Sequence, residues 1–246
     1  MKTIAMKPSL IVCSSLLCAI SSSMGASMLV DYDFESGASA STNAAGITGG
    51  GFSSNGLNLV QRYDRSGDAN MGSQVFAAQS FQAQGTVGGT QDYFEFSISA
   101  DAGKSFSVES LVFDSVYWKQ SGQTYHAIGT YQLASSADNY TTVLGTFNQD
   151  QHWDLASPAG QNKYTSSAIW KNMTFDLWGT NLDGQEFSDL TFRLYVSCTN
   201  ATNSSKSSGR RTGFDNMTVM GAVVPEPSSS ALLGLGGLAL ALRRRK

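Results

Sequence analysis

The stretch Tyr93-Phe94-Glu95-Phe96-Ser97-Ile98 decides the fold, because apolar and polar side chains alternate along it. Alternation with a period of two places the apolar residues on one face of a strand and the polar residues on the other. The same period returns in residues 173–177 and again in residues 190–196. A helix would instead repeat its apolar positions every three to four residues. These stretches therefore predict β-strands with one face packed on a core.

Weaker strand candidates are spread along the rest of the chain, at residues 29–34, 106–108, 111–118, 125–133, 142–147 and 214–219. Turn-forming sequences such as Asp101-Ala102-Gly103 and Asp183-Gly184 separate them. Many short strands in one domain predict an all-β fold, an antiparallel β-sandwich of the jelly-roll type. The segment 36–56 is rich in Gly, Ser and Ala, and we expect it to be a long loop or a poorly ordered excursion.

The composition agrees with strands and argues against a helical bundle. The chain has 246 residues, of which 25 are Gly, 4 are Pro and only 14% are charged. A helical bundle would need more Ala, Leu, Glu and Lys. Residues 27–224 hold ten basic and eighteen acidic residues, so this part carries a net charge of −8. Such acidity predicts no nucleic-acid partner and disfavours anionic lipid, whereas neutral glycans and divalent cations are compatible with it.

The N-terminus has the composition of a secretory signal peptide. Lys2 and Lys7 provide positive charge, residues 9–20 are mainly apolar, and small residues follow at 21–27. The apolar stretch is too short, and too interrupted by serine, for a membrane anchor. We expect signal peptidase to cut after Ala26, so that the mature protein begins at Ser27.

The C-terminus combines a Pro-Glu-Pro tripeptide, an apolar stretch and a basic cluster. Pro225-Glu226-Pro227 is followed by serines, by the apolar residues 231–242 and by Arg243-Arg244-Arg245-Lys246. At about 1.5 Å per residue, a helix of residues 231–242 would be about 18 Å long, against about 30 Å for a hydrocarbon core. We expect a short transmembrane helix with its basic end in the cytoplasm and the preceding domain outside.

These three elements, in this order, resemble the PEP-CTERM sorting signal of bacterial exported proteins. The residues that carry the resemblance are Pro225, Glu226, Pro227, Arg243, Arg244 and Arg245. It implies that an exosortase-type enzyme releases the chain, which is held at the cytoplasmic membrane only transiently. The destination would be the cell envelope, the cell surface or an extracellular matrix, where such proteins are commonly associated with exopolysaccharide. An ordinary membrane anchor with an incidental Pro-Glu-Pro is the alternative.

The chain is thus expected to have three parts: a signal peptide (1–26), a β-sandwich ectodomain (27–224) and a sorting tail (225–246). Of the three cysteines, only Cys198 lies in the ectodomain. No intramolecular disulfide can therefore form, and the domain must be held together by its core.

Acidic residues lie near both ends of the predicted ectodomain. Asp33 and Glu35 lie at the end of the first strand candidate, and Asp215 lies in the last one. The terminal strands of a jelly roll usually lie side by side, and the two segments loosely resemble carbohydrate-binding modules that calcium stabilises. The resemblance implies a structural Ca²⁺ held by Glu35 and Asp215, with Asp33 as a further oxygen ligand. The alternative is that these are solvent-facing strand residues.

Aromatic residues offer a place for a sugar. An aromatic face stacks on the apolar C–H face of a pyranose ring, while polar neighbours bind its hydroxyl groups. The sequence His152-Trp153-Asp154 lies in a polar stretch and is our first candidate for a glycan-binding loop, with Trp118 as a further member. Core packing is the alternative for each of the four tryptophans, Trp118, Trp153, Trp170 and Trp178.

The sequence offers little for catalysis. His126 and His152 are its only histidines, which excludes a three-histidine metal site, and no Gly-x-Ser-x-Gly, His-Glu-x-x-His or phosphate-loop sequence is present. We therefore expect a non-catalytic surface or matrix protein that binds polysaccharide. A structural coat protein without a specific ligand and a secreted glycan-cleaving enzyme, which needs only two carboxylates, are the alternatives.

Overall fold

The computed structural model describes residues 25–35, 37–61, 76–79, 85–119, 128–152, 168–199 and 210–225. The predicted signal peptide up to residue 24 and the predicted tail from Glu226 onward lie outside this part, and so does the expected transmembrane helix. Within the described ranges, no helix is long and apolar enough to cross a membrane.

Within these ranges the regular elements are strands, with one short 3₁₀ turn, η1 (Ser136–Asp138). The strands are β1 (Ser27–Tyr32), β2 (Thr42–Asn43), β3 (Ile47–Gly49), β4 (Ser53–Asn55), β5 (Asn58–Gln61), β6 (Phe76–Gln79), β7 (Tyr93–Ala100), β8 (Lys104–Lys119), β9 (Ile128–Ser135), β10 (Gly145–Asn148), β11 (Ala168–Asp176), β12 (Asp189–Thr199) and β13 (Arg210–Pro225).

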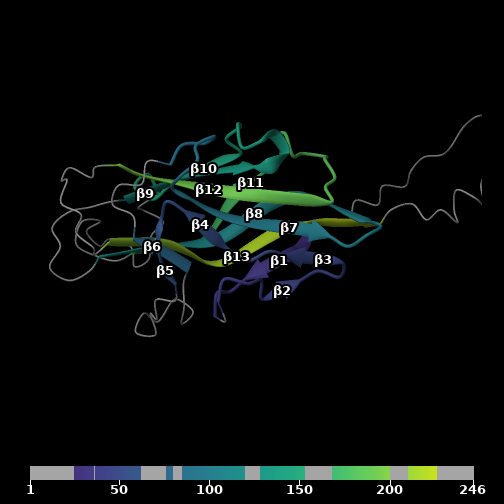
Figure 1. Ribbon diagram of the computed structural model, residues 1–246, viewed down its shortest axis with the longest axis horizontal. Helices are drawn as coiled ribbons and strands as arrows, with labels where there is room; N and C mark the ends of the chain where they lie inside the picture. The colour runs from purple at the N-terminus through teal and green to yellow at the C-terminus, as the bar shows by residue number, and fades with distance from the viewer. Residues whose placement is uncertain are drawn as a thin grey trace, which may run out of the picture.

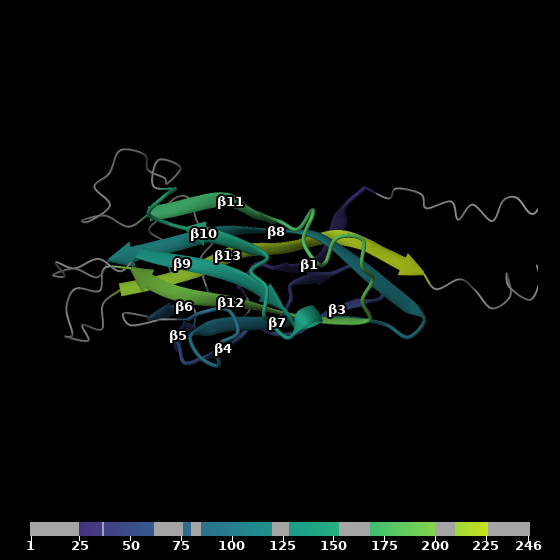
Figure 2. The ribbon, with the colours of Figure 1, turned by 90° about the horizontal axis from the view of Figure 1, so that it is seen from above.

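The strands form two antiparallel sheets that pack against each other (Figures 1 and 2). The seven-stranded sheet has the order β11-β8-β13-β1-β2, and β6, which carries β5, pairs with the first part of β13. The six-stranded sheet has the order β10-β9-β12-β7-β3, with β4 also on β7. β1 pairs with β13, so the first and last strands lie side by side, as the jelly-roll prediction requires. The predicted all-β antiparallel sandwich is confirmed.

Two of the three alternating sequences, residues 93–98 and 190–196, lie inside the six-stranded sheet, and the third lies mainly in β11 at the edge of the other sheet. β7 and β12 pair with Phe96 opposite Phe192 and Phe94 opposite Leu194. These four side chains are buried between the sheets. The polar residues between them face outward, since a strand turns successive side chains to opposite faces.

Phe214 of β13 joins the two sheets at the centre of the core. Its ring centroid lies 5.4 Å from that of Phe113 in its own sheet, and 4.6 Å and 5.5 Å from those of Tyr131 and Phe94 in the other. All four residues are buried. Tilted and edge-to-face aromatic contacts of this kind add to the stabilisation that burial gives.

The expectation of a long loop at residues 36–56 is wrong. This segment contains β2, which pairs with β1, and β3 and β4, which both pair with β7. Ile47 and Phe52 anchor it in the core. Its small residues let the backbone pass close to neighbouring strands, because a Cβ atom at Gly49 would lie 2.5 Å from Val30 Cγ1. The segment therefore supplies short edge strands whose low apolar content hides the alternation.

The two strand candidates at 106–108 and 111–118 are parts of one strand, β8. Its pairing with β13 shifts at Glu109, since Val108 and Ser110 lie opposite consecutive residues of β13. Glu109 is thus the extra residue of a bulge, which bends the strand without ending it. The interrupted alternation in the sequence marks this bulge.

The domain ends close to the Pro-Glu-Pro tripeptide. The last residues of β13 pair with the start of β8, with Val224 opposite Ser105 and Pro225 opposite Lys104, at one end of the sandwich (Figure 2). At the other terminus, β1 begins at Ser27, the first residue expected after signal cleavage. The predicted boundaries at residues 26 and 224 stay predictions, although β13 includes Pro225.

Candidate functional site

An open hollow lies where β11 ends beside β8. Trp178, two residues after β11, is 82% exposed, and Val143 at 43% is the other exposed large hydrophobic residue of the described part. The hollow has a volume of about 560 Å³. We name it the Trp178 hollow; its lining residues are Ser107, Val108, Glu109, Ser110, Thr174, Asp176, Leu177, Trp178, Asp183 and Gly184.

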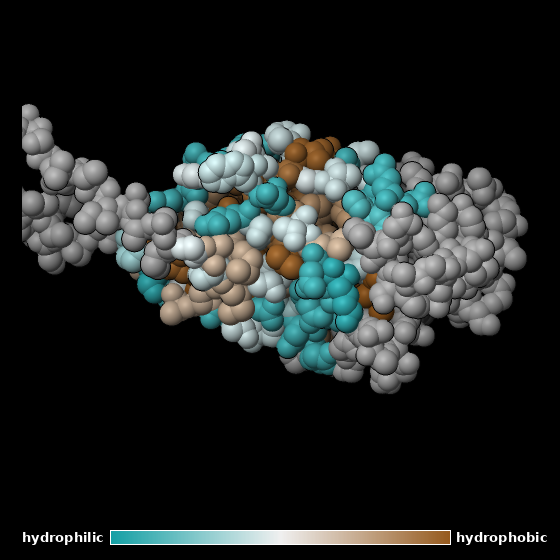
Figure 3. Space-filling view, turned by 180° about the vertical axis from the view of Figure 1, so that it is seen from behind, coloured by the Kyte–Doolittle hydropathy of each residue, from teal (hydrophilic) through white to brown (hydrophobic). Residues whose placement is uncertain are grey.

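The face of the molecule that is turned away in Figure 1 carries no large apolar area among its coloured residues. Figure 3 shows the face that is turned away in Figure 1, and apolar residues form only small, separate areas among polar ones there. Scattered apolar residues are normal on a protein surface, whereas an exposed tryptophan that lines an open hollow needs an explanation.

The turn that carries Trp178 is fixed on both sides of the tryptophan. Leu177 and Leu182 are buried in the core at 1% and 0% exposure. The backbone N–H of Leu177 donates to Glu109 O at 3.0 Å, which ties the turn to β8. Trp178 is therefore presented on a rigid support even though its own ring is exposed.

Two carboxylates shape the same turn through the backbone. Asp176 Oδ1 accepts the N–H of Trp178 at 3.0 Å, and Asp183 Oδ2 accepts the N–H of Gly179 at 3.1 Å. Gly179 has φ of 73°, a left-handed conformation that suits glycine. Because Asp176 and Asp183 also line the hollow, the groups that hold the turn place negative charge beside the indole ring.

The predicted loop His152-Trp153-Asp154 lies only partly in the described chain. The His152 ring stacks on Phe147 with centroids 5.2 Å apart, and its carbonyl oxygen accepts the indole N–H of Trp170 at 2.8 Å. Trp170 is fully buried, so core packing describes it. Trp153 and Asp154 lie outside the described residues.

Trp118 is described only through its backbone, which pairs with Arg211 of β13. A glycan site at His152, Trp153, Asp154 and Trp118 therefore stays a prediction. The sequence did include Trp178 among the candidate aromatics. Its position at the start of a turn rich in Gly, Asn and Asp is the one signal that separates it from Trp170.

The predicted calcium ligands lie in different environments. Asp215 is buried in β13, Glu35 is exposed in the turn after β1, and Asp33 lies between them in exposure. Asp33 Oδ1 accepts the backbone N–H of Glu35 at 3.0 Å, so it closes a local turn. Within the described ranges, no three His, Cys, Asp or Glu side chains gather closely enough to hold a metal ion.

Asp215 lies directly opposite Asp114 of β8. Asp114 joins two bulged neighbours, since it accepts the backbone N–H of Asn172 at 2.8 Å and the side-chain amide of Asn216 at 3.1 Å. Both asparagines have positive φ, at 55° and 47°. Asp114 was not singled out from the sequence, because only the register of three strands brings these groups together.

The carboxyl group of Asp215 is poorly satisfied. Its Oδ2 is buried and has no hydrogen-bond partner. Burial raises the pKa of Asp215 to about 7, and the negative charges of Asp114, Glu35 and Asp33 act in the same direction. An orphaned carboxylate oxygen is compatible with a cation or with a proton at this position. A structural Ca²⁺ stays a prediction.

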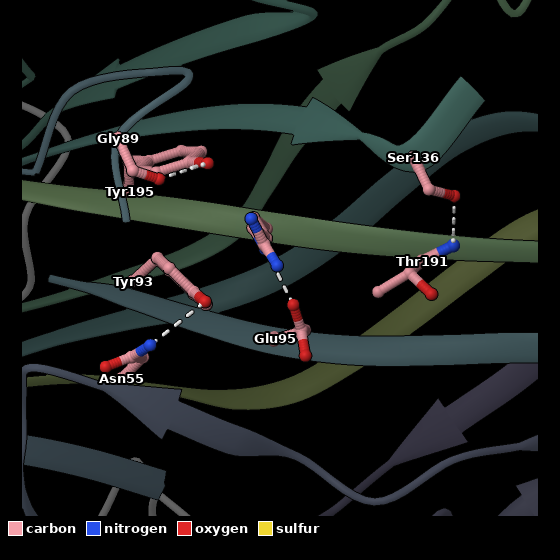
Figure 4. A network of polar contacts seen from close by, with 8 residues as sticks. Asn55, Gly89, Tyr93, Glu95, Ser136, Thr191 and Tyr195 are labelled. Atoms are coloured by element: carbon pink, nitrogen blue, oxygen red, sulfur yellow. Dashed lines mark hydrogen bonds and ion pairs between the residues drawn. The ribbon is translucent and has the colours of Figure 1, made fainter. Parts of the chain in front are cut away.

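A second aromatic cluster lies on the outer face of the six-stranded sheet. The Arg193 guanidinium lies 4.3 Å from the Tyr93 ring centroid and 3.8 Å from that of Tyr140, and its Nε donates to Glu95 Oε2 at 2.6 Å. We name these four residues the Arg193 cluster. Figure 4 shows Tyr93 and Glu95 within the surrounding polar contacts.

Neighbouring contacts close this cluster further. The Tyr93 hydroxyl accepts the amide of Asn55 at 3.2 Å, and the Tyr195 hydroxyl donates to Gly89 O at 3.2 Å (Figure 4). Tyr93 and Tyr195 are buried. Their ring faces and hydroxyls are used within the chain, so the Arg193 cluster is structural.

The C-terminal residues were compared with known protein families. The model of the PEP-CTERM protein-sorting motif matches residues 223–246. The chain carries a PEP-CTERM sorting motif. Its recognition from Pro225-Glu226-Pro227 and the arginine cluster is confirmed, and the motif indicates export and sorting to the cell envelope by way of an exosortase-type enzyme. The match begins at Val223, which still belongs to β13.

Solved structures similar to this chain include a cleaved adhesin domain of Lys-gingipain from Porphyromonas gingivalis, with 14% identity over 77% of this chain and 96% of that one and a TM-score of 0.38. A carbohydrate-binding module that recognises mannan is 8% identical, covers 80% of this chain and 99% of its own, and has a TM-score of 0.37. An adhesin domain of Epf from Streptococcus pyogenes is 14% identical, with the match covering 79% of this chain and 64% of that one, and has a TM-score of 0.22. Nothing about a ligand follows from likeness of this size. No curated protein sequence gave a significant match.

Proposed function

We propose that this PEP-CTERM protein is exported through a cleaved signal peptide, held briefly at the cytoplasmic membrane by its tail and released by an exosortase-type enzyme. The match at residues 223–246 supports this order of events. The domain supports it too, because β13 ends at Pro225 and the folded part leads directly into the motif. The released protein would be a component of the cell surface or of an extracellular matrix.

We also propose that the domain acts without catalysis, by binding an uncharged polysaccharide. The exposed indole of Trp178 over a hollow lined by carboxylates and hydroxyls carries this part of the proposal. A sugar chain needs an apolar face for its C–H surface and polar groups for its hydroxyls, and the hollow offers both. The net charge of −8 in residues 27–224 would repel acidic polymers.

The sorting step is tested by intact-mass measurement of the protein recovered from the cell surface. The proposal predicts an N-terminus at Ser27 and the loss of Arg243 to Lys246. Replacing Glu226 and Pro227 by Ala should leave the protein in the membrane fraction, whereas Val143→Ala should be released normally. Recovery of surface protein that retains Arg243 to Lys246 would contradict the release step.

The binding step is tested by thermal unfolding of the exported protein with a panel of soluble neutral polysaccharides. A ligand that binds only the folded state raises the midpoint according to RT ln(1 + [L]/Kd). A shift with at least one glycan is expected, without new reducing ends. No shift with any glycan would favour the structural coat protein, and new reducing ends would identify the glycan-cleaving enzyme.

A further inference from the structure

We propose that the Trp178 hollow is the polysaccharide-binding site and that it takes a short segment of a single uncharged pyranose chain. This inference rests on the proposed function and adds to it the place and the charge preference of the site. It moves the site from the predicted loop around Trp153 to the end of β11.

The indole ring of Trp178 is available to a ligand. At 82% exposure, nearly all of its surface contacts solvent, whereas Trp170, eight residues earlier, is fully buried. Stacking of a sugar ring on an aromatic face removes apolar surface of both partners from water, which is favourable. Leaving so large a ring in solvent brings no stability to the fold, so a binding role accounts for it better than a packing role.

The support of Trp178 is ordered before any ligand arrives. The flanking Leu177 and Leu182 are buried in the core. The Thr180 hydroxyl donates to Leu177 O at 2.7 Å, and the Asn181 amide donates to Asp138 Oδ2 of η1 at 3.1 Å. A preorganised turn reduces the entropy lost on binding, so a single exposed ring can give a measurable affinity.

The charge of the hollow selects among glycans. Glu109, Asp176 and Asp183 line it, and no Lys or Arg is among the described lining residues. Carboxylate oxygens accept hydrogen bonds from sugar hydroxyls and repel uronate, sulfate or phosphate groups. The hydroxyls of Ser107, Ser110 and Thr174 supply further polar partners. An uncharged chain therefore fits, and an acidic one does not.

The size of the hollow limits the bound segment. Its volume of about 560 Å³ lies within the range of roughly 300–1,000 Å³ that small-ligand sites occupy. The exposed indole leaves one side open to solvent. A polymer can thus place a few sugar units in the hollow while the chain continues on both sides, as a matrix component requires.

The test is calorimetric titration of the full chain in a detergent without a sugar headgroup. The probes are neutral β-glucan, xyloglucan, galactomannan and dextran, and the acidic polymer is polygalacturonate. Trp178→Ala should weaken binding of the preferred neutral glycan at least tenfold, and Trp178→Phe should weaken it less, because a smaller aromatic face remains. The matched control is Val143→Ala, which removes the other exposed large hydrophobic side chain of the described part, is not among the lining residues of the hollow and should bind normally.

A second variant tests the charge preference. Glu109→Gln removes one negative charge without touching the hydrogen bonds that hold the turn, and it should weaken the neutral glycan about threefold. Polygalacturonate should bind the wild-type protein at least tenfold more weakly than the neutral glycan, and the Glu109→Gln variant should narrow this difference.

The outcomes separate the site from the function. If the wild type binds a neutral glycan and Trp178→Ala binds it equally well, the assignment of the site is overturned while the proposed function stands. If polygalacturonate binds as tightly as the neutral glycan, the charge preference is overturned. If the wild type binds no member of the panel, polysaccharide binding fails, and the assignment of the site fails with it.

Discussion

The Trp178 hollow and the Arg193 cluster use the same residue types in opposite ways. Both place aromatic rings beside carboxylates at the edge of the core. In the Arg193 cluster, one guanidinium covers Tyr93 and Tyr140 and pairs with Glu95. In the Trp178 hollow, the carboxylates hold the turn while the indole ring is 82% exposed.

The difference shows that composition alone does not identify a binding surface. An aromatic ring beside polar groups is structural when its face is covered by the chain's own cation, and it is available when its face is open. Stability should therefore depend on the Arg193 cluster, and ligand binding should depend on the Trp178 hollow.

The largest expected loss of stability comes from Arg193→Ala. The change removes two cation–π contacts and leaves Glu95 without its cation, so the free energy of unfolding should fall by about 2–3 kcal/mol. Urea denaturation at neutral pH measures the loss. Glycan binding should be unchanged in this variant, and a loss below about 0.5 kcal/mol would show that the cluster is not structural.

A gain in stability is expected from Asp215→Asn at high pH. Because the pKa of Asp215 in the folded protein is raised to about 7 from an ordinary value of 3.8, the folded state holds an additional proton between these values. The stability of the wild type should therefore fall as pH rises from about 4 to about 7 and change no further through this group. Asn carries no charge, so the variant should be more stable than the wild type at pH 8 and as stable as the wild type near pH 4.

Urea denaturation at pH 4, 6 and 8 measures this difference. Asp189→Asn, which removes an exposed carboxylate, supplies a matched control. Parallel profiles for the wild type and Asp215→Asn would show that burial of Asp215 imposes no cost on its charge.

Calcium should give a shift of about 1 kcal/mol if a cation occupies the region of Asp215, Glu35 and Asp33. At a concentration several times Kd, linkage gives a stabilisation of this size. The shift should be present at pH 8 and absent at pH 5, because a proton on Asp215 competes with the cation. If the midpoint of unfolding at pH 8 is the same with calcium and with a chelator, the calcium prediction is wrong, and a proton is the partner of Asp215.

The smallest effect on stability is expected from Trp178→Ala. Since the side chain is 82% exposed, its removal should change the free energy of unfolding by less than about 0.5 kcal/mol. This near-neutral result sharpens the contrast with Arg193→Ala. A loss of 2 kcal/mol or more in urea denaturation would mean that the indole ring packs against the domain.

Much of the fold could be predicted from the sequence, because a half-buried strand needs apolar and polar residues that alternate along the chain. The strands of segment 36–56 could not be predicted in this way. Edge strands that pass close to their neighbours need Gly and Ser in place of a regular apolar face. The sequence also did not show that residues 106–108 and 111–118 form one strand, because the bulge at Glu109 interrupts the alternation without ending the strand.

The sequence could predict the kind of site, an aromatic side chain beside polar groups, but not which residues form it. Trp170 and Trp178 are the same residue type in neighbouring polar sequences, and the packing of the core alone decides that the first is buried and the second exposed. The pairing of Asp114 with Asp215 depends on the register of β8 and β13, which no local pattern encodes. The sorting tail was readable because its three elements are contiguous and need no tertiary contact.

The most direct test of the account is the accessibility of the Trp178 ring during binding. Acrylamide quenching of tryptophan fluorescence is compared between the wild type and Trp178→Phe, each with and without a saturating neutral polysaccharide. The account predicts that the glycan lowers quenching of the wild type and leaves quenching of Trp178→Phe unchanged. Equal protection of both proteins would place the sugar at another tryptophan, and would contradict the assignment of the Trp178 hollow as the binding site.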